Sequence, residues 1–179
     1  MKPQDCVVLI KLLANPKHLE LSQNELAVHL CMSVSEVNAG IKRLLKAGLL
    51  RRDHANDSSK INYKPIATAT IEFFIHGLKY AYPANYGELT RGIPTSYAAP
   101  ILKKHFVIGD EAIPVWPHAE GNAKGFALSP LYRSVPNSLI KYPDDDFYDL
   151  LALIDAIRHG KARERNMAIK LLEKKLKGL

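Results

Sequence analysis

The sequence predicts a mainly α-helical protein with a small amount of β-structure, an α+β chain. Two pairs with the spacing of a capping box, Ser22 with Glu25 and Ser33 with Glu36, predict two short helices in quick succession. Residues 147–177 are rich in apolar residues at helical spacing, which predicts two further helices. In between, the prolines of residues 80–143 leave room only for short helices and strands.

Composition sets the broad class. The 179 residues carry a formal net charge of +7 and have a pI near 9.4, which favours an anionic partner. Residues 1–64 and 65–179 share the excess, and much of the second half's positive charge lies in residues 158–177. Cys6 and Cys31 form no Cys-x-x-Cys pair, so neither a disulfide framework nor a metal site is expected, and no cofactor motif is present. With no apolar run long enough for a signal peptide or a membrane span, a cytoplasmic location without a membrane partner is expected.

The first 64 residues predict a definite order of elements. Residues 7–13 are almost all apolar and predict a buried helix, and residues 19–21 predict a short strand. The two capped helices follow, separated by a turn at residues 31–33, and the second presents Val37, Ile41 and Leu44 as an apolar stripe. Gly48 ends that helix, after which residues 49–53 and 60–64 predict two strands around the polar segment HANDSSK.

This order, with KRLLKAGLLRRD between the second helix and the hairpin, resembles the winged helix-turn-helix domains of bacterial transcriptional regulators such as the MarR-like group. The resemblance covers roughly residues 5 to 64, so we expect residues 1–64 to form that domain. It implies binding to double-stranded DNA, with the second helix of the motif in the major groove and the hairpin on the backbone. Such regulators commonly act as dimers, because two recognition helices then meet two half-sites.

The resemblance also implies which side chains face DNA. The base-reading candidates lie off the apolar stripe in the N-terminal part of the second helix: Val34, Ser35, Glu36, Asn38, Ala39 and Lys42. The phosphate-contacting candidates are hydroxyls at helix starts and flexible cations: Ser22, Ser33, Arg43, Lys46, Arg51, Arg52, Lys60 and Lys64.

These residues have simpler explanations as well. Ser22 and Ser33 have the spacing of helix caps, and Glu36 either caps its helix or discriminates cytosine. Asp57 makes the hairpin tip neutral to acidic, which argues against strong insertion into the minor groove. A winged helix can also serve only as a scaffold for protein contacts.

Residues 65–179 are expected to form a second, mostly helical module for dimerisation, partner binding or effector binding. Residues 66–77 predict a helix with a bulky apolar face. Residues 112–116 and 124–128 predict a short hairpin around HAEGN, and residues 89–98 a loop with a turn of helix. The expected core of this irregular region is Trp116, Phe126, Leu131 and Tyr132. Two helices, residues 147–159 and 162–177, complete the chain.

Two features of this half remain open. A possible effector pocket is lined by the aromatic residues Tyr80, Tyr82, Tyr97 and Trp116 and by the cation Arg91. The same rings could instead simply build a core. The basic segment RHGKARER, residues 158–165, suits a solvated helix end, an acidic partner or an extension of a DNA footprint.

The sequence therefore predicts a sequence-specific DNA-binding transcriptional regulator that acts as a dimeric repressor. No nucleophile elbow, phosphate loop or dinucleotide fingerprint is present, so no enzymatic activity is expected. The second half is similar to uncharacterised winged-helix proteins of bacteria, and some proteins of this build are antitoxins. The alternative function is accordingly a protein-interaction module, such as an antitoxin that neutralises a partner protein.

Overall fold

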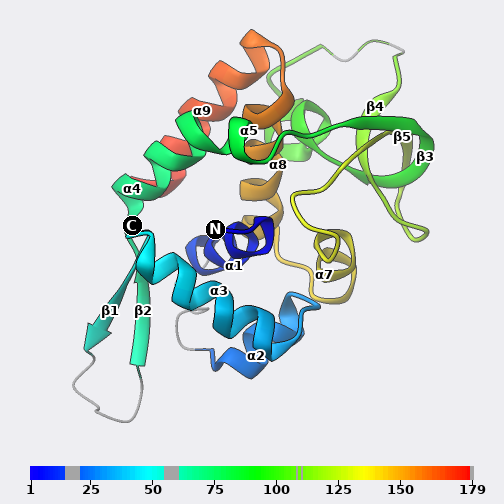
Figure 1. Ribbon diagram of the computed structural model, residues 1–179. Coiled ribbons are helices and arrows are strands. Elements are labelled where there is room, and N and C mark those ends of the chain that lie inside the picture. The colour runs from blue at the N-terminus through cyan, green and yellow to red at the C-terminus, as the bar shows by residue number, and fades with distance from the viewer. Residues whose placement is uncertain (15–20, 55–60, 108, 110, 178–179) are drawn as a thin grey trace.

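The computed structural model describes residues 1–14, 21–54, 61–107, 109 and 111–177, and it confirms a mainly helical protein with small sheets (Figure 1). A bundle of helices occupies one side of the molecule, and a small β-barrel packs against its C-terminal part. No helix in the described ranges combines the length and the apolarity that a membrane crossing requires.

The N-terminal elements follow the expected order. Helix α1 (Pro3–Ala14) is followed by α2 (Gln23–His29), α3 (Val34–Lys46) and the antiparallel hairpin of β1 (Leu50–His54) with β2 (Ile61–Pro65). Both capping boxes are formed, since Ser22 and Ser33 each accept from the backbone N–H of the glutamate three residues later. Gly48 follows α3 with a φ of 70°, a left-handed conformation that glycine adopts at little cost. The predicted strand at residues 19–21 and most of the hairpin tip fall outside the described residues, apart from Leu21 and His54.

A long helical segment leads out of the hairpin into the second half. It consists of α4 (Ala67–Glu72), a π-helical turn η2 (Phe73–Gly77) and α5 (Leu78–Ala81). Phe74 and Leu78 from the predicted apolar face are fully buried, and the segment packs on the helices at the C-terminal end of the chain. The predicted helix at residues 66–77 is therefore present and continues one turn further.

The β-structure of the second half is a closed barrel of three strands, β3 (Tyr86–Pro94), β4 (Ile113–Pro117) and β5 (Ala123–Leu128). The predicted hairpin of the last two strands is wrong, because β4 and β5 pair in parallel. Both are antiparallel to β3, and Gly92 of β3 is in register with Pro117 and with Ala123. Residues 118–122 therefore connect two parallel strands and do not form the turn of a hairpin.

Closure of so small a barrel depends on close backbone approach. A Cβ at Gly92 would lie 2.1 Å from the carbonyl oxygen of Trp116, and one at Gly125 would lie 2.0 Å from that of Ile113. Only glycine fits at such contacts. The predicted loop over residues 89–94 is also wrong, since this segment is part of β3, although residues 96–98 do form a helical turn, η3 (Ser96–Ala98).

The remaining helices are α6 (Pro100–Lys103), α7 (Val135–Lys141), α8 (Asp145–His159) and α9 (Ala162–Leu176). Asp144 caps α8 by accepting from the backbone N–H of Phe147 at 3.0 Å. Inside α8, the buried Asp155 accepts hydrogen bonds from Thr95 Oγ1 at 2.9 Å and Trp116 Nε1 at 2.7 Å. It also pairs with the buried Arg158 at 2.9 Å, so one carboxylate joins the barrel to α8.

The structure changes two expectations for this half. Trp116 and Leu131 are buried as predicted, but the side chain of Phe126 is 43 % exposed and Tyr132 is only half-buried. The segment RHGKARER is not simply a solvated helix end, because Arg158 is buried and Arg165 donates to the carbonyls of Ile157 and Gly160 at the end of α8.

One hydrophobic core extends through both halves of the chain, and α1 connects them. Helix α1 packs on α3 on one side and on α8 on the other (Figure 1). Every residue from Asp5 to Leu13 is buried, including Lys11, which pairs with Asp144 at 2.7 Å. The expected boundary at residues 64 and 65 coincides with the end of β2, but the apolar cluster is continuous across it.

Candidate nucleic-acid interface

Helix α3 has one buried and one exposed face. Val37, Gly40, Ile41 and Leu44 are buried against the neighbouring helices, because their spacing places them on one side of the helix. The opposite side presents Ser35, Lys42 and Lys46 to solvent, with the half-buried Ala39 between them. Val34 begins the helix and is 44 % exposed. We call Ser35, Ala39, Lys42 and Lys46 the outer stripe of α3.

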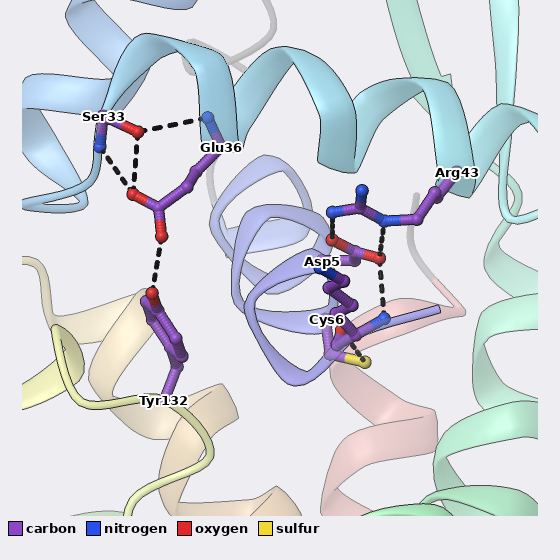
Figure 2. A network of polar contacts seen from close by, with 7 residues as sticks. Asp5, Cys6, Ser33, Glu36, Arg43 and Tyr132 are labelled. Atoms are coloured by element: carbon purple, nitrogen blue, oxygen red, sulfur yellow. Dashed lines mark hydrogen bonds and ion pairs between the residues drawn. The ribbon is translucent and has the colours of Figure 1, made fainter.

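Arg43 lies on the flank of α3 that faces α1 and is held there. Its Nε and Nη2 donate to the two carboxylate oxygens of Asp5 at 2.7 Å and 2.6 Å (Figure 2). Asp5 is completely buried, and it also accepts from the backbone N–H of Lys2. These hydrogen bonds raise the pKa of Arg43. Although Arg43 was expected to contact phosphate, its fork of donors is directed into the protein.

Gly40 permits this approach of the two helices. A Cβ at position 40 would lie 3.2 Å from Asp5 Oδ1, closer than an ordinary contact. The absence of a side chain at Gly40 therefore lets the buried carboxylate lie against α3, where Arg43 reaches it.

Glu36 is likewise engaged within the protein. One carboxylate oxygen accepts from the backbone N–H and the hydroxyl of Ser33, and the other accepts from Tyr132 Oη at 2.5 Å (Figure 2). These hydrogen bonds, led by that of Tyr132, lower the pKa of Glu36 to about 2. Glu36 is therefore an ionised cap at neutral pH, and Tyr132 ties the second half of the chain to the start of α3.

Replacing Tyr132 with phenylalanine is expected to raise the pKa of Glu36 toward its ordinary value near 4.5, because the largest stabilising contact of the carboxylate is removed. A carboxylate whose pKa is lower in the folded state than in the unfolded state stabilises the protein at pH values above the unfolded-state pKa. For Glu36 this contribution is lost as the pH falls from about 4.5 to about 2. The acid sensitivity of the variant should thus be smaller in that window. A carboxyl-detected NMR titration of Glu36 measures the shift directly.

Tyr142→Phe is the matched control, because it also removes one tyrosine hydroxyl near α7. The ring of Tyr142 stacks on His29, and Tyr142 does not contact Glu36 among the hydrogen bonds of that carboxylate. An unchanged Glu36 titration in Tyr132→Phe would contradict the contact.

The other expected base-reading and capping residues have internal partners of varying strength. Asn38 Nδ2 donates to Gln23 Oε1 of α2 at 2.8 Å, which fixes the orientation of its amide. Ser22 and Ser33 are exposed but serve as caps, and the Ser33 hydroxyl also lies 3.0 Å from that of Ser35. Ser35 keeps an exposed side chain beside this cap.

The hairpin after α3 adds exposed cations. Arg51 and Arg52 on β1 and Lys64 on β2 are exposed, and Arg51 stands opposite Lys64 in the strand register. Lys60 lies outside the described residues.

The five residues expected to line an effector pocket do not gather in one. Trp116 is 1 % exposed and belongs to the core, whereas Tyr80 is 76 % exposed. Tyr82 is half-buried beside α8, where its carbonyl accepts from Arg158, and Arg91 is exposed on β3. Tyr97 alone of the five lines the cavity beside β3 and β5 that is described below.

Asp5 and Tyr132 were not expected from the sequence to be partners of α3. Asp5 lies in an apolar helix, and a buried acid in such a helix is a sign of a buried cationic partner. Tyr132 is 96 positions from Glu36 in the chain, and nothing local in the sequence signals their contact.

The described residues thus place two capped helices, α2 and α3, before the hairpin of β1 and β2, and the second half of the chain is built on a barrel and helices. Comparisons of the chain with protein-family models, with curated proteins and with solved structures give no match.

Proposed function

We propose that the protein is a sequence-specific DNA-binding transcriptional regulator in which the outer stripe of α3 enters the major groove. The observation that carries the proposal is the composition of that stripe: Ser35, Lys42 and Lys46 are exposed along one side of a rigid, doubly capped helix. Hydroxyl and ammonium groups of this kind contact base edges and phosphates.

The internal contacts of α3 support the same interpretation. Glu36 is the only acidic residue of α3, and its charge is committed to Ser33 and Tyr132 on the flank of the helix. Arg43 holds the helix on α1 and leaves contacts with phosphate to Lys46 and to Arg51, Arg52 and Lys64 of the hairpin. Among the described basic residues of α3 and the hairpin, Arg43 therefore positions α3. The others, Lys42, Lys46, Arg51, Arg52 and Lys64, are exposed.

The proposal includes a dimer that acts as a repressor, since two copies of α3 would read two half-sites one helical turn apart. The proportion of protein to duplex in the bound complex, measured by light scattering, tests the dimer separately.

The test uses the full chain and a library of randomised DNA duplexes, from which bound sequences are selected and sequenced. For the selected duplex, Lys42→Ala with Lys46→Ala is expected to weaken binding roughly 100-fold at low salt. The slope of log affinity against log salt concentration should fall by roughly two, because two phosphate-neutralising charges are lost. Ser35→Ala should instead change the preferred sequence more than the salt dependence.

Lys170→Ala with Lys174→Ala is the matched control, since it removes two exposed lysines from α9. Equal loss in the two double variants would reduce DNA binding to a general effect of net charge. Selection of no sequence from the library would reject the proposal and favour the protein-interaction alternative.

A further inference from the structure

A cavity of about 1140 Å³ lies far along the chain from the α2–α3 motif, between the barrel and the junction of α8 and α9. Its walls come from β3, β5, η3, the segment after α6 and residues 159–164. None of the described residues of α2, α3 or the hairpin lines it. Its volume is sufficient for a small organic ligand.

Four aromatic residues, Tyr86, Tyr97, Phe106 and Phe126, line the cavity. Tyr86 and Phe126 are 50 % and 43 % exposed, and Tyr97 and Phe106 are half-buried. Few large apolar side chains are exposed in the described chain, and three of them, Tyr86, Phe126 and Val107, line this cavity. Exposed rings that gather in a concave site are typical of ligand binding.

The charged residues that line the cavity include more cations than carboxylates. Lys104, Lys161 and Arg163 line it, together with two carboxylates, Glu111 and Glu164. The Glu164 carboxylate accepts from the backbone N–H of Lys161 at 2.8 Å, and this contact at the start of α9 occupies it. Arg163 lies 5.7 Å from the centroid of the Phe106 ring, so one cation stands directly beside the aromatic wall.

Hydrogen-bond donors complete the site. Burial raises the pKa of both Tyr86 and Tyr97, so that their hydroxyls stay protonated across the physiological range. Each hydroxyl can therefore donate to an anion. His159 makes an edge contact with the Tyr86 ring at 4.5 Å between ring centroids, which fixes one side of the pocket.

We propose that this cavity binds a small aromatic anion, with the ring of the ligand between Tyr86, Tyr97 and Phe126 and its acidic group at Lys161 and Arg163. The combination of stacking surfaces, phenolic donors and an excess of cations matches this chemistry. The class includes nucleoside monophosphates and aryl carboxylates. The site is independent of the proposed DNA binding.

The experiment uses the full chain and the fluorescent probe 8-anilinonaphthalene-1-sulfonate, an aromatic anion. One molecule is expected to bind per chain, and N-phenyl-1-naphthylamine, which lacks the sulfonate, should bind at least roughly tenfold more weakly. Arg163→Glu should weaken the sulfonate probe by roughly tenfold or more, and Phe126→Ala by roughly three- to tenfold. Both side chains are accessible at the cavity, so circular dichroism and melting temperature should show a folded protein.

Lys170→Glu is the matched control, because it makes the same charge change at an exposed position of α9 that does not line the cavity. Competition by adenosine monophosphate or by benzoate supports the proposal and distinguishes a nucleotide from an aryl carboxylate. Equal affinity for the neutral probe overturns the anion assignment, and wild-type affinity in folded Phe126→Ala and Arg163→Glu overturns the location.

Discussion

Replacing Asp155 with alanine is expected to destabilise the protein by about 3–5 kcal/mol, as is typical when one member of a buried ion pair is removed. The side chains of Asp155 and Arg158 are each 2 % exposed, so the variant would bury an uncompensated guanidinium. Thr95 and Trp116 would lose their acceptor at the same time. Denaturant unfolding with linear extrapolation measures the change.

Asp149→Ala is the matched control on the same helix. Its carboxylate pairs with Lys175 at 3.0 Å near the surface, where such pairs contribute about 1 kcal/mol or less. Asp155→Asn should fall between the two, because the amide oxygen can still accept from Trp116. Equal losses in Asp155→Ala and Asp149→Ala would show that the buried network contributes nothing special.

Asp5→Ala is expected to lower the free energy of unfolding by about 3 kcal/mol, toward the lower end of the range for buried pairs, because the Arg43 side chain remains 31 % exposed and can be hydrated. Arg43→Ala should cost a similar amount, since it leaves the completely buried Asp5 carboxylate without its cation. The double variant should lose much less than the sum of the two single losses, with a coupling of roughly 1.5–3 kcal/mol. A double-mutant cycle in denaturant measures that coupling.

The exposed pair of Lys177 with Glu173, at 3.2 Å, provides the comparison cycle on α9. Its coupling should be roughly 0.3–0.5 kcal/mol. Additive losses for Asp5 and Arg43 would contradict the account of Arg43 as the residue that positions α3.

Local signals in the sequence were enough to predict α2, α3 and the hairpin strands that follow them. Both capping boxes, the stripe of Val37, Ile41 and Leu44 and the glycine after α3 act within a few residues of one another. Each of these signals therefore favours the same local structure in the isolated segment as in the folded protein.

The barrel could not be predicted in this way, because its pairing depends on a third strand. The segment HAEGN between β4 and β5 has the composition of a hairpin turn, but Gly92 of β3 is the pairing position for both flanking residues. Strand pairing between residues that are far apart in sequence leaves no local trace, and β3 itself contains glycine and proline that disfavour a strand assignment.

The sequence predicted which face of α3 is exposed. It did not predict which residues from other elements contact the side chains at the margins of that face. Periodicity identifies which side of α3 is exposed, and Ser35, Ala39, Lys42 and Lys46 follow from it. Arg43 and Glu36 lie at the margins of that face, where periodicity does not decide between solvent and a neighbour. Their orientation depends on Asp5 and Tyr132, which approach from other parts of the chain.

Because α1 is buried on both sides, we expect the two halves to fold and unfold together. A fragment ending at residue 64 would expose the surface of α1 that α8 covers, so calorimetry of the full chain should show one transition with equal calorimetric and van't Hoff enthalpies. Any molecule that binds only the folded state then stabilises both halves together. An aromatic anion bound in the cavity near the end of α8 would therefore raise the temperature at which α3 unfolds, although it makes no contact with α3.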